Sequence, residues 1–91
     1  MSVLLNQVRN VMRTRRYSLE TEKTYIYWMK KYIFFHHVRH PKEMGAAEIG
    51  AFLTHLAVEE KVAATTQNQA MFALLFLYEG SPLREARTAW R

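Results

Sequence analysis

Residues 17–38 read YSLETEKTYIYWMKKYIFFHHV, the longest stretch of the chain with a helical pattern. Ser18 has the side chain of a helix N-cap, because its hydroxyl can accept a first-turn amide, and the glutamates that follow suit the positive end of the helix dipole. Pro41 cannot donate a backbone hydrogen bond and disfavours helix in the residue before it. We therefore predict a helix from Leu19 to about Val38.

This helix is expected to have two different faces. The face predicted to pack in the core carries Tyr25, Trp28, Met29, Tyr32, Ile33 and His36. The other face carries Lys23, Tyr27, Lys30, Lys31 and Phe34. Aromatic residues at helical spacing most often pack in a core, whereas the second face mixes aromatic groups with positive charge.

The sequence on either side predicts three more helices and no strand. They cover residues 3–15, 46–60 and, from Ala64 or Thr65, the run that ends at Tyr78. The last run is apolar nearly all round, which is expected of a helix with neighbours on several sides. Gly80 is a candidate C-cap, and the serine and proline after it stop the helix. The fold class predicted is all-α, with four helices.

The chain has 91 residues and no cysteine, so a single small domain without disulfides or a thiolate zinc site is expected. No segment approaches the roughly 18 consecutive apolar residues of a membrane helix, and the start lacks an export signal. We expect a cytoplasmic protein that does not bind membranes. A reducing compartment fits the absence of cysteine.

The net charge of +5 is unevenly distributed. Residues 1–42 hold nine Lys and Arg against two Glu, a balance of +7, and residues 43–91 hold four against six, a balance of −2. Such asymmetry indicates a polyanionic partner such as nucleic acid, although a solvated basic face on an ordinary protein gives the same count.

No catalytic or metal-binding set of residues is recognised. The chain has no aspartate, and its three glycines are too far apart to form a phosphate-binding loop. His36 and His40 have the spacing of a helical zinc pair, but no cysteine or carboxylate completes a site, so partly buried or phosphate-facing histidines are the simpler interpretation. We predict no catalytic residues, no metal, no cofactor and no small-molecule substrate.

Two stretches are candidates for contact with DNA. In residues 13–24 a basic cluster adjoins hydroxyl groups at a helix start, where amides and the dipole favour phosphate. In residues 64–69 short hydroxyl and amide side chains occupy the first turn of the last helix, where they can cap that helix or contact phosphates and base edges. The candidates are Arg15, Arg16, Ser18, Thr21, Lys23, Thr24, Thr65, Thr66, Gln67 and Gln69, with Lys30 and Lys31 supported by charge alone.

At these residues the sequence resembles the N-terminal core-binding domain of integron integrases, a branch of the tyrosine site-specific recombinases. The resemblance runs in one register over about residues 3–78. It is carried by YSLETEKTY (17–25), WMKKYI (28–33), HPKEMGAAEI (40–49), FLTHLAV (52–58), VAATTQNQA (62–70) and ALLFLY (73–78).

The resemblance implies a four-helix, SAM-like orthogonal bundle that binds one face of double-stranded DNA. It assigns the DNA contacts to the starts of the second and fourth helices, hence to Ser18, Thr21 and Thr24 and to Thr65, Thr66 and Gln69. Related recombinases often have a basic residue at the position of Gln69, which weakens the expected contact there.

The resemblance also implies what these residues lack. The family's catalytic segment, with its Arg, Lys, His, Arg and Tyr residues, does not follow, so we expect a truncated, noncatalytic module. We divide the chain into a DNA-binding domain at 1–79 and a divergent tail at 80–91. The alternative is a protein-interaction or self-association module that exposes apolar surface around Phe34, Phe76 and Trp90, and a homo-oligomer is compatible with either function.

Overall fold

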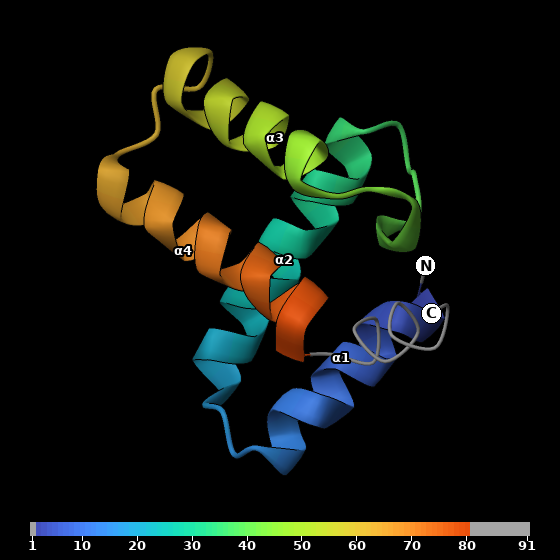
Figure 1. The fold of residues 1–91 in the computed structure, drawn as a ribbon. Coiled ribbons are helices and arrows are strands. Elements are labelled where there is room, and N and C mark those ends of the chain that lie inside the picture. The colour runs from blue at the N-terminus through green and yellow to red at the C-terminus, as the bar shows by residue number, and fades with distance from the viewer. Residues whose placement is uncertain (1, 81–91) are drawn as a thin grey trace.

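The computed structural model describes residues 2–80, and within that range it contains helices and no strands (Figure 1). The elements are α1 (Ser2–Thr14), α2 (Leu19–Phe35), the 3₁₀ turn η1 (Pro41–Glu43), α3 (Ala46–Val58), α4 (Ala64–Leu75) and the π-helical turn η2 (Phe76–Gly80). The predicted all-α, four-helix fold is confirmed. Trp90 and the other residues after Gly80 lie outside the described range, so the predicted tail is not described.

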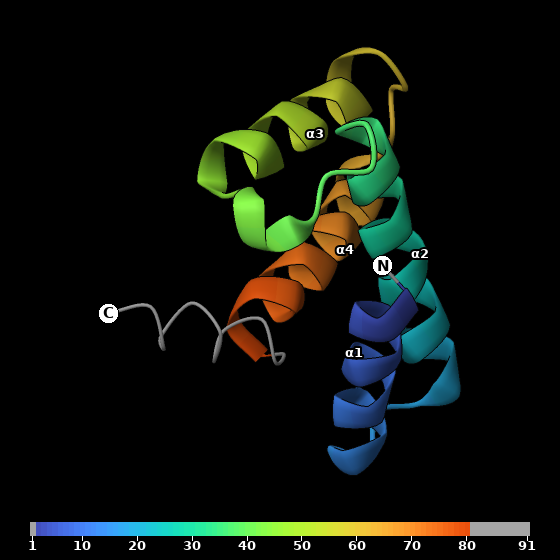
Figure 2. The same ribbon diagram turned by 90° about the vertical axis from the view of Figure 1, so that its right-hand side faces the viewer.

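Helix α2 is the central element, because α1, α3 and α4 all pack against it. In Figure 1, α4 crosses in front of α2, while α1 lies beside the first half of α2 and α3 beside its last turns. Figure 2 shows the same arrangement from the side. Within residues 2–80, no helix is both long and apolar enough to span a bilayer.

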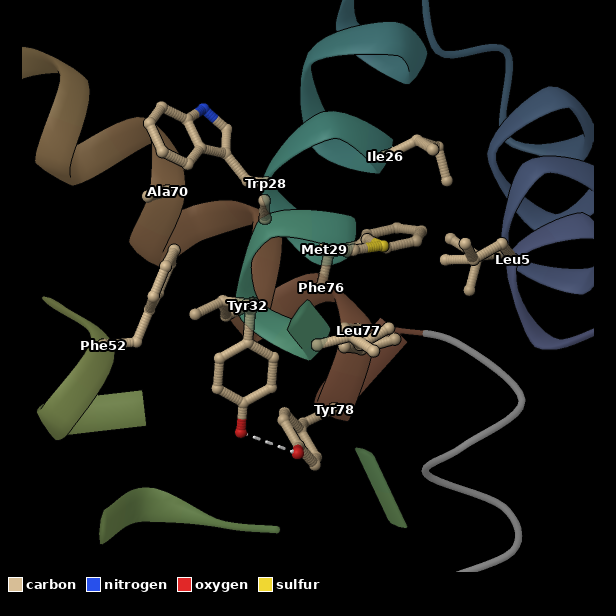
Figure 3. Packing of buried hydrophobic residues seen from close by; sticks show 14 of the residues in the cluster. Leu5, Ile26, Trp28, Met29, Tyr32, Phe52, Ala70, Phe76, Leu77 and Tyr78 are labelled. Atoms are coloured by element: carbon tan, nitrogen blue, oxygen red, sulfur yellow. Dashed lines mark hydrogen bonds between the residues drawn. The ribbon is translucent and has the colours of Figure 1, made fainter. Parts of the chain in front are cut away.

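The predicted core face of α2 is largely confirmed. Trp28 is 6% exposed, Met29 and Tyr32 are fully buried, and Ile33 is 2% exposed. They join one cluster that includes Leu5 of α1, Phe52 of α3 and Ala70 of α4 (Figure 3). Tyr25 and His36 are only half-buried. Packing of this face against three neighbours is what holds α2 in place.

A buried chain of two hydroxyl groups and a carbonyl ties together α2, η1 and η2. The Tyr78 hydroxyl donates to the Pro41 carbonyl oxygen at 2.6 Å, and the Tyr32 hydroxyl donates to the Tyr78 oxygen at 3.0 Å (Figure 3). Burial, with the Tyr78 hydrogen bond as a second cause, raises the pKa of Tyr32 far above its ordinary value. Tyr32 therefore stays neutral, and its hydroxyl is paired within the interior.

Helices α1 and α2 both end without glycine. Arg16 and His37 have φ of 60°, and the bonds Tyr17 N to Met12 O (3.0 Å) and Val38 N to Ile33 O (2.9 Å) close the Schellman pattern at each end. The prediction that the second helix reaches Val38 is wrong by three residues. The left-handed residues turn the chain there, and the His36 ring anchors the turn by donating from Nε2 to the Glu48 carbonyl oxygen of α3 at 2.9 Å.

The end of α4 also differs from prediction. After Leu75 the α-helix widens into the π-helical turn η2, in which Phe76 is only 8% exposed. The aromatic ring packs 5.4 Å from that of Tyr17, so the expectation that Phe76 forms an exposed apolar surface is wrong. Gly80 does not adopt the left-handed conformation of a C-cap. A Cβ at position 80 would lie 3.1 Å from the Phe76 ring and 3.2 Å from the Arg15 guanidinium, so a side chain there would require these groups to shift slightly.

Helix α4 is not enclosed on all sides as its composition suggests. Ala70, Ala73 and Leu74 are fully buried, whereas Phe72 is 52% and Leu75 is 44% exposed. The reason is that α4 packs against α2 and α3 and leaves its remaining face to solvent.

Candidate nucleic-acid interface

The start of α2 is capped from within. As predicted, Ser18 is the N-cap: its Oγ accepts from the Thr21 amide at 3.1 Å and also donates to Thr21 Oγ1 at 2.8 Å. Thr24 Oγ1 donates to the Glu20 carbonyl oxygen at 3.0 Å. The hydroxyl protons of Ser18 and Thr24 are therefore used within the helix, and that of Thr21 is not. Because a phosphate oxygen accepts hydrogen bonds, Thr21 is the hydroxyl that can donate to a phosphate here.

The basic residues at this end differ in what they contact. Arg15 places its guanidinium 5.7 Å from the centre of the Phe76 ring, a cation–π contact directed at η2. Arg16 and Lys23 are exposed and form no ion pair within residues 2–80. Arg16 has a left-handed backbone and lies two residues before the N-cap of α2. Arg16 and Lys23 are thus the cations best placed for a phosphate here.

The start of α4 has no side-chain cap. The helix begins at Ala64 with Ala63 as its N-cap, so the alternative that Thr65 or Thr66 caps it is wrong. Neither threonine hydroxyl has a hydrogen-bond partner among the described residues. Gln67 is partly engaged, since its Nε2 donates to the Val62 carbonyl oxygen at 2.8 Å. Open amides and two available hydroxyls make this helix start the better suited of the two for an anion.

Gln69, the remaining candidate at this helix start, is exposed.

The middle of α2 carries Lys30 and Lys31 in different states. Lys30 is exposed and has no carboxylate within ion-pair distance in the described part of the chain. Lys31 Nζ lies 2.8 Å from Glu60 Oε1, and Glu60 Oε2 lies 3.0 Å from His55 Nε2. The Lys31 hydrogen bond lowers the pKa of Glu60, and that of Lys31 is raised in turn. Lys31 is therefore charged but already paired.

The two helix starts lie on one side of the molecule. Figure 1 places the first turns of α2 and α4 in its left-hand half, and Figure 2 places both in its right-hand half. η1 lies on the opposite side in both views. Two ion pairs border the exposed face of α2. On one side Glu22 pairs with Arg13 of α1, and on the other Lys31 pairs with Glu60, which follows α3.

A groove next to this face brings in a residue that sequence reasoning missed. It has a volume of about 250 Å³, and it is lined by Arg9, Glu22, Lys23, Ile26, Tyr27 and Lys30. We call it the α1–α2 groove. Arg9 lies on the polar side of α1 and has no motif around it, so only the packing of α1 on α2 places it with these lysines.

The two histidines with the spacing of a zinc pair are used within the fold. His36 donates to a backbone carbonyl, as described above, and His40 Nδ1 accepts from the Lys42 amide at 3.2 Å. Burial, and then the nearby Lys42 charge, lowers the pKa of His40. No cluster of three or more metal-ligating side chains occurs among residues 2–80.

The sequence matches a known protein family whose domain is helical like this one. The profile described as "Phage integrase, N-terminal SAM-like domain" matches residues 4–87. The chain belongs to this family. Two curated relatives of the SAM-like domain, each described as "Integrase/recombinase", come from Escherichia coli and Pseudomonas aeruginosa. Each is 48% identical over 75 residues, which cover 82% of this chain and 22% of the relative. The SAM-like domain thus spans about a fifth of the length of these relatives.

Proposed function

We propose that this SAM-like domain binds double-stranded DNA in an integrase or recombinase system, through the starts of α2 and α4. The observation that carries the proposal is the uncapped start of α4, with available hydroxyls at Thr65 and Thr66, on the same side as the start of α2 (Figures 1 and 2). Hydroxyls, open amides and unpaired cations are the groups that position a protein on a phosphate backbone. The relatives' description supports the same conclusion.

The expected mode is phosphate-dominated binding with limited base readout. Such binding weakens steeply with salt, because each neutralised phosphate releases counterions. A titration of a fluorescently labelled duplex at several salt concentrations tests the proposal. Binding that falls linearly on a log–log plot supports it, and no binding even at low ionic strength would sink it.

Variants at the helix starts locate the site. Replacing both Thr65 and Thr66 by valine keeps the shape and removes the hydroxyls, so duplex affinity should fall. Thr54→Val, at an exposed position of α3, is the matched control. Arg16→Ala should weaken binding to unrelated duplexes about equally, since a phosphate contact carries no sequence information. An effect restricted to one sequence would contradict that role for Arg16.

The finer parts of the proposal rest on resemblance. We infer that the domain derives from the integron-integrase branch, that it works in the cytoplasm where the DNA is, and that these 91 residues do not cleave DNA alone. An integron attachment-site duplex should then compete better than a scrambled duplex of equal length. Equal competition would count against the integron branch, and strand cleavage by the isolated chain would count against the noncatalytic role.

A second candidate function is self-association. An apolar groove of about 340 Å³ is lined by Tyr17, Tyr25, Phe72, Leu75, Phe76, Glu79 and Gly80, and it is where the exposed apolar side chains of α4 lie. A second copy of the chain could cover this groove. Light scattering at high concentration tests this: Phe72→Ser should reduce dimer content, whereas Val3→Ser on α1 should not. A strictly monomeric wild type would exclude it.

A further inference from the structure

The α1–α2 groove combines positive charge from two helices with an apolar and aromatic surface. Arg9 comes from α1, and Lys23 and Lys30 come from α2. Between them lie Ile26, which is 4% exposed, and Tyr27, which is 55% exposed. The groove is thus an accessible depression with cations at its margin.

The one carboxylate in the groove is already neutralised. Glu22 accepts from Arg13 Nε at 3.3 Å and from Arg13 Nη2 at 3.2 Å, and its side chain is only 5% exposed. Arg9 bonds a neutral partner, donating from Nη1 to Asn6 Oδ1 at 2.9 Å. A bidentate pair leaves Glu22 little capacity to repel an anion.

Arg9, Lys23 and Lys30 have no ion-pair partner within residues 2–80. The groove is therefore a site of uncompensated positive charge, which suits an anion that brings more than one negative group.

The spacing of the cations fits a polyanion. Lys23 and Lys30 are seven residues apart on one helix, which at 1.5 Å per residue is about 10 Å along the α2 axis. One strand of B-DNA carries a charge per about 3.4 Å of axis, so lysines about 10 Å apart can contact different phosphates of the same duplex. Both lysines belong to the exposed face of α2 that begins at the proposed DNA contact, and the groove continues that face toward α1.

We propose that the α1–α2 groove binds backbone phosphates of the same DNA duplex, which makes Arg9 of α1 part of the interface. This inference rests on the proposed function and extends the contact surface from two helix starts to a third place. The contact is independent of sequence, because the guanidinium and ammonium groups meet phosphates rather than base edges.

The test is the salt dependence of duplex binding for Arg9→Gln and Lys30→Gln. The matched control is Lys42→Gln, which removes one positive charge on η1, on the side away from the starts of α2 and α4. Each groove variant should reduce the slope of log affinity against log salt by about 0.9, the value for one phosphate contact. The ratio of wild-type to variant affinity for the duplex should then fall about 3.5-fold between 50 and 200 mM salt. The control should keep the wild-type slope.

The outcomes separate the two proposals. If the wild type binds duplex and both groove variants behave like Lys42→Gln, the groove inference is overturned while the proposed function stands. If the wild type does not bind, the proposed function fails. Binding of inorganic phosphate is measured on the same variants at constant ionic strength. Phosphate binding that is lost in Arg9→Gln while duplex binding is unchanged would assign the groove to free phosphate and overturn the backbone contact. Circular dichroism of each variant confirms that it is folded.

Discussion

The Tyr32–Tyr78–Pro41 chain makes a sharp prediction about stability, because its two hydroxyls are not equivalent. In Tyr78→Phe, the Tyr32 hydroxyl loses its acceptor and the Pro41 carbonyl oxygen loses a 2.6 Å donor, although it keeps the Met44 amide at 3.0 Å. In Tyr32→Phe, the Tyr78 hydroxyl still donates to Pro41. The first change therefore leaves a buried donor unpaired, and the second does not.

The magnitudes follow from that difference. A buried hydroxyl left without a partner costs about 1–3 kcal/mol, and a lost hydrogen bond whose carbonyl keeps another donor costs about 1 kcal/mol. Tyr78→Phe should therefore lower the free energy of unfolding by about 2–4 kcal/mol. Tyr32→Phe breaks one bond and should cost about 0.5–1.5 kcal/mol.

Urea unfolding followed by circular dichroism measures both values. With a slope of about 1 kcal/mol per molar urea for a small domain, Tyr78→Phe should move the midpoint about 0.5–3.5 M further than Tyr32→Phe. Tyr27→Phe, at an exposed ring, is the control and should leave the midpoint unchanged. If Tyr32→Phe proves as costly as Tyr78→Phe, the assignment of donors and acceptors in this chain is wrong.

Three further predictions concern charge, backbone and pH. Glu60→Gln frees Lys31 from its 2.8 Å partner, so it should tighten duplex binding and steepen the salt dependence of that binding. The control Glu59→Gln should do neither, and equal effects of the two variants would place Lys31 away from the phosphates. His37→Gly removes the left-handed strain at φ 60° and should raise the free energy of unfolding by up to about 1 kcal/mol, measured by urea; a decrease would contradict strain there. A backbone hydrogen bond lowers the pKa of Glu48, so its stabilisation is present above the ordinary value of 4.5 and is lost as the pH falls through the lower folded value. The melting temperatures of wild type and Glu48→Gln should thus converge in acid, and a gap that persists would refute this contribution.

Prediction from sequence succeeded where the signal is local. The core face of α2 follows from helical periodicity, and the N-cap at Ser18 follows from a hydroxyl that bonds an amide three residues away. Prediction failed at Val38, where the chain turns, and at Phe76, where the α-helix gives way to a π-helical turn; both places contact distant residues. The ring of His36 bonds α3, and that of Phe76 packs on Tyr17, and neither contact has a trace in the sequence nearby.

The candidate interface divides in the same way. The two helix starts and the basic half of the chain are visible as short motifs and as charge. The sequence does not show which cations are available to a ligand. Lys31 is paired with a glutamate 29 residues along the chain, and Arg9 meets the lysines of α2 only in the α1–α2 groove.

The sequence by itself therefore determined the number of helices and the buried face of α2, because these depend on neighbours three or four residues apart, and its composition determined the sign of the charge. The tertiary structure alone decided which hydroxyls, amides and cations remain available together on one side. That depends on how α1, α3 and α4 pack against α2, and such packing is set by side-chain contacts between segments far apart in the chain.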